Sequence, residues 1–369
     1  MDEDEAAVSR AGTLGIPIAM TLSTLLSCSS VRPDEAPATA DVMHPRIVDT
    51  RFENPVGSPT VTNTWRDELS LWWKMAWVSP TEVSHSVPNG HVLPEAEAIA
   101  QLDSQQQADT LTWLGHASFL IRFGGKVILT DPYLSEYASP VARIGPKRYV
   151  QPGIAIERLP PIDVLLISHN HYDHLDRRAL ARIPHRERIS VVVPLGLAAG
   201  LRDFGFKEIV EVTWGDARDF QALRVTAVPA IHFSGRGLRD RNKTLWAGFV
   251  LSSGDTKIYF AGDTGYHGQL FKQMREVFGP IDVALVPIGA YEPANLMADI
   301  HVNPEEAVTI GRDLGARDLV AMHWGTVVLA LEPPFEPPTR FRTAGRAAGY
   351  SDESLWVMQI GQTRRIVDR

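Results

Sequence analysis

Cysteine is almost absent from this chain of 369 residues: Cys28 is its only one, so no disulfide bond can form within the chain. Lysine and arginine form no block or stripe, and the formal net charge is −8. A groove for nucleic acid is therefore not expected. Charged residues are also missing from residues 11–27, but this apolar run is short for a helix that crosses a membrane. The sequence leaves the oligomeric state open.

The first 28 residues allow two interpretations. Residues 24–28 read TLLSC, which resembles the end of a bacterial lipoprotein signal, whose cysteine becomes the lipidated first residue after cleavage. This interpretation predicts a protein anchored through Cys28 to a membrane of the bacterial envelope. The leader departs from the pattern because residues 2–5 are all acidic, where a secretory signal carries positive charge. The alternative is an irregular arm on a cytoplasmic protein.

Composition divides the rest of the chain into two parts. Residues 29–107 are expected to form a linker and an accessory segment, because residues 29–59 are rich in proline, alanine, aspartate and threonine. Residues 108–369 are expected to form the main domain. The accessory segment contains a tryptophan-rich helix, which either lies at a membrane interface, where tryptophan is favoured, or packs on the main domain. Four residues fall on one side of this helix: Trp65, Leu69, Trp72 and Trp73.

Short apolar strands alternate with helices beyond residue 109. Residues 111–123 and 126–130 are predicted to form a hairpin around two glycines, and strands are also predicted at residues 162–167, 189–194, 209–214, 223–228, 246–251, 257–261, 283–288 and 319–322. Helices are predicted at residues 176–183, 195–204, 268–278 and 304–314. Runs of strands followed by helices indicate two sheets packed together with helices on both outer faces.

The segment SHNHYDHLD at residues 168–176 is the most informative feature of the sequence. It places His169, His171, Asp173 and His174 within six positions, directly after a strand that is expected to be buried. Imidazole nitrogen and carboxylate oxygen are the usual ligands of a hydrolytic zinc ion. Open α/β sheets place their sites at such strand ends. The segment therefore predicts a metal site.

Four other apolar strands end on a residue that can bind a metal or orient a ligand. The residues are Asp131, His232, Asp263 and His323. With the first segment, they provide five histidines and two aspartates for metal, and Asp131 remains. Seven ligands are too many for one tetrahedral ion with an open position. They suit two ions that share one carboxylate and one hydroxide.

These residues carry a resemblance. The pattern HxHxDH followed by distant His, Asp and His resembles the metallo-β-lactamase superfamily of dinuclear hydrolases. Within that superfamily, the chain from about residue 51 onward is similar to the N-acylphosphatidylethanolamine-hydrolysing phospholipases D. The segments that carry this closer similarity are WLGHA (113–117), LTDP (129–132), GPKR (145–148), residues 159–176, FAGDTGY (260–266), FGPID (278–282), PIGAYEP (287–293), HVNPEEA (301–307) and HWGT (323–326).

The resemblance implies the fold, the metals and the ligand sets. The fold is the αββα sandwich of two mixed sheets flanked by helices, with residues 108–369 as the catalytic domain. The cofactors are two zinc ions, with iron or manganese as possible replacements. One ion is held by His169, His171 and His232 and the other by Asp173, His174 and His323, with Asp263 as the bridge.

The resemblance also implies roles around the metals. Asp173 additionally orients the attacking hydroxide, and His301 lies beside the bound phosphate as a catalytic residue. His116 and Asp131 are expected to orient ligand imidazoles. Tyr291 and Glu292 are expected to shape the wall of the substrate pocket.

The implied reaction is hydrolysis of N-acylphosphatidylethanolamine to an N-acylethanolamine and phosphatidic acid, through a hydroxide that bridges the metals. The partners would be a phospholipid substrate and a membrane surface. Two alternatives remain open from the sequence. The same centre could attack a lactone or another ester, or a metal could stabilise a membrane lipoprotein that has no catalytic activity.

Overall fold

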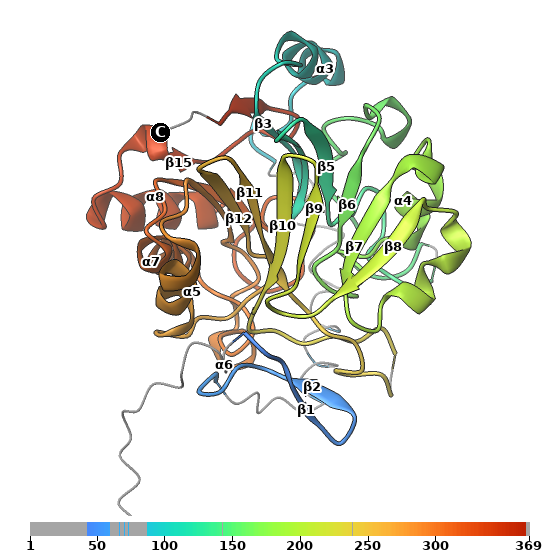
Figure 1. Ribbon diagram of the computed structural model, residues 1–369. Coiled ribbons are helices and arrows are strands. Elements are labelled where there is room, and N and C mark those ends of the chain that lie inside the picture. Colours follow the sequence, from blue (N-terminus) through green and yellow to red (C-terminus); the bar gives the residue numbers. More distant parts are fainter. Residues whose placement is uncertain are drawn as a thin grey trace, which may run out of the picture. The chain divides into compact units, whose positions relative to one another are not determined.

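Two mixed β-sheets of seven strands each pack against one another in the computed structural model of the chain (Figure 1). The structure describes residues 43–59, 66, 70, 73, 87–141, 143–237 and 239–366. These residues belong to one compact unit, Pro37–Arg369. The predicted signal at residues 1–28 lies outside the described residues.

The first sheet contains the strand that leads into the histidine segment. Its order is β16-β3-β4-β5-β6-β7-β8, with antiparallel pairs from β16 to β5 and parallel pairs from β5 to β8. Its strands are β3 (Thr110–Gly115), β4 (Ser118–Phe123), β5 (Lys126–Thr130), β6 (Val164–Leu166), β7 (Ser190–Pro194), β8 (Glu208–Val212) and β16 (Thr363–Arg365).

The second sheet has the same mixed character. Its order is β15-β14-β13-β12-β11-β10-β9, antiparallel from β9 to β12 and parallel from β12 to β15. Its strands are β9 (Ala217–Phe220), β10 (Leu223–Val228), β11 (Gly248–Ser253), β12 (Thr256–Phe260), β13 (Val283–Pro287), β14 (Asp318–Met322) and β15 (Leu355–Trp356).

Helices cover the outer faces of both sheets, so the layers run helix, sheet, sheet, helix (Figure 1). Helices α3 (Glu95–Ser104) and α4 (Arg177–Arg182) pack in the apolar cluster outside the first sheet. Helices α5 (Leu270–Phe278), α7 (Pro304–Leu314) and α8 (Pro337–Ala347) cover the second sheet, and α6 (Ala294–Met297) is a single turn. The αββα arrangement predicted from the sequence is confirmed.

Aromatic side chains fill the space between the sheets. Trp113 and Phe119 from the first sheet share one buried cluster with Phe249 and Phe260 from the second. Burial of one such ring removes roughly 150–250 Å² from water, so this layer contributes strongly to the stability of the fold. The strand ends, and with them the site, are therefore fixed by a core that links the two sheets.

Helix α7 shows how local sequence fixes an element that leads away from the site. Asn303 caps the helix by accepting the backbone N–H of Glu306, and the Glu306 carboxylate accepts the backbone N–H of Asn303. Pro304 occupies the first turn, where its missing N–H costs nothing. Gly315 ends the helix in the left-handed region at φ 64°. The predicted span, residues 304–314, is confirmed.

Two predicted elements differ from the structure. Residues 195–204 were expected to form a helix, but they form two short 3-10 turns, η3 (Ala198–Gly200) and η4 (Arg202–Phe204). Gly196 before them and Gly205 after them take positive φ values of 89° and 72°, which interrupt a helix. Residues 111–123 were expected to be one strand, but the chain turns at His116, whose φ is 55°, and forms β3 and β4.

The described part of residues 29–107 contains regular structure. Strands β1 (Arg46–Val48) and β2 (Arg51–Glu53) form an antiparallel hairpin within the stretch that composition predicts as linker. Phe52 donates its backbone N–H to the carbonyl of Asn242, which ties the hairpin to the main domain.

The tryptophan-rich segment lies mostly outside the described residues. Arg66, Ser70 and Trp73 are helical and exposed, and 66% of the Trp73 surface is open to solvent. No helix among the described residues is long and apolar enough to cross a membrane.

Candidate metal centre

The residues of the predicted site follow the ends of strands from both sheets. His169 follows β6 and Asp131 follows β5, while His232, Asp263 and His323 follow β10, β12 and β14. Neighbouring parallel strands bring their carboxyl ends to the same edge of a sheet. The packing of the two sheets then places the two sets of side chains together.

Three histidines form the first group. His169 Nε2 lies 2.8 Å from His171 Nδ1, and His232 Nε2 lies 3.2 Å from the same nitrogen. Two nitrogens that each lie about 2.1 Å from one tetrahedral zinc ion are about 3.4 Å apart, so these spacings are close to those of ligands that share an ion. His169 and His232 are buried, whereas His171 is partly exposed. The group therefore offers one ion three ligands.

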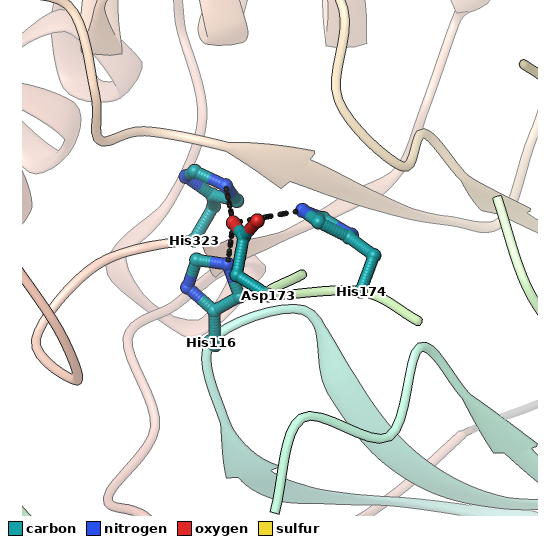
Figure 2. Close-up of side chains that lie close together, drawn as sticks. All are labelled: His116, Asp173, His174 and His323. Carbon is teal, nitrogen blue, oxygen red and sulfur yellow. Dashed lines mark hydrogen bonds and ion pairs between the residues drawn. The ribbon is translucent and has the colours of Figure 1, made fainter. Parts of the chain in front are cut away.

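The second group surrounds one carboxylate oxygen (Figure 2). Asp173 Oδ2 lies 2.9 Å from His116 Nε2, 3.3 Å from His174 Nε2 and 3.6 Å from His323 Nε2. Figure 2 shows the three imidazoles pointing toward this carboxylate from different directions. The arrangement brings together residues that are far apart in the sequence. His116 was expected to orient an imidazole, and in the structure its Nε2 contacts the Asp173 carboxylate.

Asp263 joins the two groups. Its Oδ2 lies 3.2 Å from His174 Nε2, 3.7 Å from His232 Nε2 and 3.9 Å from His169 Nε2. Its other oxygen, Oδ1, lies 3.1 Å from His323 Nε2. One carboxylate thus reaches ring nitrogens of both groups, as a bridging ligand would.

Hydrogen bonds behind the site orient the imidazoles of both groups. Asp131 Oδ2 lies 2.7 Å from His174 Nδ1 and also accepts the hydroxyl of Ser168 at 2.5 Å, while Asp131 Oδ1 accepts the Ser168 backbone N–H. The Ser168 hydroxyl in turn lies 2.9 Å from His169 Nδ1. His232 Nδ1 lies 2.9 Å from the carbonyl of Ile300. A carboxylate or carbonyl in this position fixes the ring so that Nε2 faces the site.

The two carboxylates are held ionised. Burial raises the pKa of Asp173, but the charge of His174 and hydrogen bonds from neighbouring histidines outweigh burial and hold that pKa well below its usual range. Burial likewise raises the pKa of Asp263, and His174 and His323 reverse the shift. Both aspartates are therefore anionic at neutral pH and available to a cation.

The pKa of each histidine reflects a balance between burial, which lowers it, and the nearby carboxylates, which raise it. Burial lowers the pKa of His169 and of His232 well below the usual range, and it lowers the pKa of His171 to about 4. The first group is therefore neutral at pH 7, which is the form that binds metal. Burial also lowers the pKa of His323, but Asp263 and Asp173 outweigh it and raise that pKa to about 9.

The donor set fits two metal ions. The buried ring nitrogens His174 Nε2 and His323 Nε2 have no well-aligned hydrogen-bond partner among the described residues, and neither does Asp263 Oδ1. These atoms lie within 3.2 Å of the Asp263 carboxylate or belong to it, so nitrogen and oxygen donors converge at the centre of the site, as a bound cation requires. Nitrogen and oxygen donors in this number match zinc, and iron or manganese accepts the same set.

His301 reaches the same centre. It is buried just before α7, and its Nδ1 lies 4.0 Å from Asp263 Oδ2. Its ring centre is 5.0 Å from that of His232. Burial, foremost, lowers its pKa to about 4, so the imidazole is neutral at pH 7 and carries one N–H. It can therefore donate one hydrogen bond into the site.

Tyr291 and Glu292 lie farther out. Tyr291 is buried, and the Arg340 guanidinium stacks over its ring at 4.7 Å from the centroid. Glu292 is exposed, and its carboxylate accepts the backbone N–H of Ala294 at the start of α6. Neither residue lines the cavity beside His323 in the described part of the chain.

Two supporting residues are not visible in the sequence pattern. Arg236 is partly buried, donates to the carbonyls of Asn170 and Leu175, and stacks on Tyr172 at 3.8 Å, so it holds the histidine loop from outside. Thr326 accepts the backbone N–H of His116 at 2.8 Å. Their partners are mostly backbone atoms distant in the sequence, and no local spacing marks such contacts.

Three residues of the site have a strained backbone. His116, Asp131 and His323 have positive φ values of 55°, 32° and 61°, which residues with a side chain rarely adopt. Strain of this kind costs about 1–3 kcal/mol per residue and clusters at functional sites. Gly289 is required beside His323, because a Cβ there would lie 2.2 Å from the His323 carbonyl oxygen.

Comparisons with known proteins agree with this geometry. Residues 126–324 match the beta-lactamase superfamily domain. The chain is 40% identical over 270 residues to N-acyl-phosphatidylethanolamine-hydrolyzing phospholipase D 1 of Caenorhabditis elegans, which covers 70% of this chain and 76% of that protein. It is 39% identical over 284 residues to an uncharacterized protein of Mycobacterium tuberculosis, with 76% of this chain and 74% of that protein covered.

A solved structure shares the fold. Isothiocyanate hydrolase from Delia radicum gut bacteria aligns with a TM-score of 0.56 at 22% identity, over 69% of this chain and 98% of that one. Two mixed sheets between helices, with histidines and aspartates gathered at their strand ends, define an αββα protein with a site able to bind metal. The chain belongs to the metallo-β-lactamase superfamily.

Proposed function

We propose that the protein is a metal-dependent hydrolase of the phospholipase D type, which cleaves N-acylphosphatidylethanolamine to an N-acylethanolamine and phosphatidic acid. The observation that carries the proposal is Asp263, whose two oxygens reach ring nitrogens of both histidine groups. A site built in this way suits two ions, and two ions suit in-line displacement at phosphorus. The relative from Caenorhabditis elegans, which bears the phospholipase name, supports the substrate class.

The proposed ligands follow the two groups. His169, His171 and His232 would hold one zinc ion, and Asp173, His174 and His323 the other, with Asp263 shared. Two bound cations lower the pKa of a water molecule and neutralise the charge that develops on phosphoryl oxygens. Asp131 and Ser168 would keep the imidazoles in the required tautomer from behind.

The remaining residues act on the substrate. Asp173 is ionised and would hold the attacking water in line through a hydrogen bond to its free oxygen. His301 is buried and neutral, so it would donate its N–H to a phosphate oxygen and would not carry a charge. His116 donates toward Asp173, which keeps that carboxylate aligned. Tyr291 and Glu292 are proposed to support the wall of the substrate site from outside.

The bond that is cut can be identified with isotopic oxygen. Hydrolysis of N-acylphosphatidylethanolamine in oxygen-18 water should place the label in the phosphatidic acid, because the attacking oxygen bonds to phosphorus. Mass spectrometry of both products measures this directly. A panel of lactones and simple esters run beside the lipid provides the control for substrate class. Label found only in the ethanolamine product, or turnover of lactones with no phosphodiesterase activity, would overturn the proposal.

We further propose that the protein is anchored to a bacterial envelope membrane through Cys28, with the phospholipid bilayer as its partner surface. The support is the TLLSC segment at residues 24–28. The mature protein should then begin at a lipid-modified Cys28, and Cys28→Ala should move it from the membrane fraction to the soluble fraction. Mass spectrometry of native protein that shows an intact N-terminus with residues 1–27 present would end the anchor hypothesis and favour the cytoplasmic alternative.

A further inference from the structure

In the histidines of the metal centre, the ring nitrogens that point away from the centre do not all have a hydrogen-bond partner among the described residues. His174 Nδ1, His232 Nδ1 and His169 Nδ1 contact a carboxylate, a carbonyl and a hydroxyl, respectively. His323 differs, because its Nδ1 is buried and has no hydrogen-bond partner among the described residues. A metal-bound imidazole almost always donates this N–H to an acceptor, and a buried donor without one costs about 1–3 kcal/mol. His323 therefore needs an acceptor.

A cavity lies beside His323, and its wall also includes the polar side chains of Tyr149, Glu332 and His116 and the indole of Trp324. Most of its other lining residues are aliphatic, among them Val327, Val328 and Leu329. The hydroxyl of Tyr149 is buried and, like His323 Nδ1, has no partner among the described residues. The Trp324 indole N–H likewise has no partner among the described residues. His323 Nδ1, the Tyr149 hydroxyl and the Glu332 carboxylate supply three polar groups at the wall of one cavity, the number that a buried water typically contacts.

The carboxylate of Glu332 is fixed in position. It accepts the backbone N–H of Ala290 at 2.6 Å through Oε1 and that of Glu292 at 3.1 Å through Oε2. Ala290 takes a positive φ of 67°, and Gly289 before it lies against the His323 carbonyl. The two hydrogen bonds hold this strained loop under His323. Each carboxylate oxygen keeps a second lone pair that can accept another hydrogen bond.

We propose that Glu332 and Tyr149 are positioning residues for His323, joined to its Nδ1 by a water in this cavity. The water accepts the Nδ1–H of His323 and the O–H of Tyr149, and it donates to the Glu332 carboxylate. The chain of hydrogen bonds holds the ring with Nε2 toward the metal. This chain of hydrogen bonds supports binding of the ion held by Asp173, His174 and His323. It does not affect the ion held by the three-histidine group. This inference rests on the proposed two-metal centre.

Two variants test the inference through metal binding. Tyr149→Phe removes the hydroxyl and keeps the ring, which packs 6.1 Å from Phe335 between centroids. Glu332→Gln keeps the shape and removes the charge. In each, one of the two ions should bind about 10–100-fold more weakly in competition with a chelator, and the other should keep its affinity. The visible spectrum of cobalt-substituted protein should change in the same variants.

Matched controls separate this role from general destabilisation. Tyr350→Phe removes a hydroxyl that bonds the carbonyl of Ala316, and Glu353→Gln removes an exposed charge. Both should bind two ions as the unmodified chain does. Equal affinity of Tyr149→Phe and Glu332→Gln for both ions would overturn the inference. An unmodified chain that binds no metal would instead refute the proposed function, so the two failures are distinguishable.

Discussion

Replacing Asp173 with asparagine is expected to lower turnover by about a thousandfold or more while the fold persists. Asp173 Oδ2 is shared by ring nitrogens of His116, His174 and His323 at 2.9, 3.3 and 3.6 Å. Asparagine has nearly the same volume, so packing is kept. Asparagine is neutral, so it lacks the negative charge that holds the metal ion and aligns the attacking water.

Circular dichroism and turnover measured on the same preparations decide this prediction. Asp255→Asn is the matched control, because Asp255 lies in an exposed turn between β11 and β12 and the chemical change is identical. The control should keep full activity. Asp173→Asn with an intact spectrum and near-normal activity would remove Asp173 from the site.

The second large effect is expected at Asp263. Its two oxygens lie within 4.0 Å of ring nitrogens from five histidines, and no other side chain described here reaches both groups in this way. Asp263→Asn removes the shared charge, so both ions should bind weakly and activity should fall at least as far as in Asp173→Asn, roughly a thousandfold or more. In Asp173→Asn, by contrast, the ion at the three-histidine group should remain.

Metal content measured after dialysis separates the two variants. The expected order is two ions per chain in the unmodified protein, about one in Asp173→Asn and close to none in Asp263→Asn, from the two-ion arrangement. The Asp255→Asn control should bind as the unmodified protein does. Full metal content in Asp263→Asn would show that this carboxylate does not join the two positions.

Local patterns account for the elements that were predicted well. The span of α7 follows from a capping box at Asn303 and Glu306, a proline in the first turn and a closing glycine, all adjacent in sequence. Strand β6 follows from a short apolar run. Residues 195–204 were predicted incorrectly because their apolar content resembles a helix, whereas Gly196 and Gly205 turn the backbone away from one.

Long-range contacts explain what the sequence does not reveal. The hairpin of β1 and β2 lies in a stretch with the composition of a linker, and it is held by a bond from Phe52 to Asn242. At the break in residues 111–123, the backbone N–H of His116 is accepted by Thr326, which lies more than two hundred residues away. Composition and periodicity report neither contact.

The site residues also fall into those that local sequence predicts and those that depend on long-range contacts. Strand ends identify Asp131, His169, Asp263 and His323 as candidates without any structure, since each follows a clear apolar run. Spacing alone does not show which histidines share an ion; that division came from the resemblance, and the structure brings the same residues together. Glu332 was missed, because its importance depends on a cavity and on two backbone N–H groups far away in the sequence.

Anomalous X-ray diffraction from crystals of the metal-loaded protein, collected above and below the zinc absorption edge, tests the central claim most directly. The account predicts two separate peaks in the unmodified chain. One should lie among His169, His171 and His232 and the other among Asp173, His174 and His323, with Asp263 between them. A single peak in fully active crystals, or two peaks of which either lacks Asp263 as a neighbour, would contradict the two-metal centre.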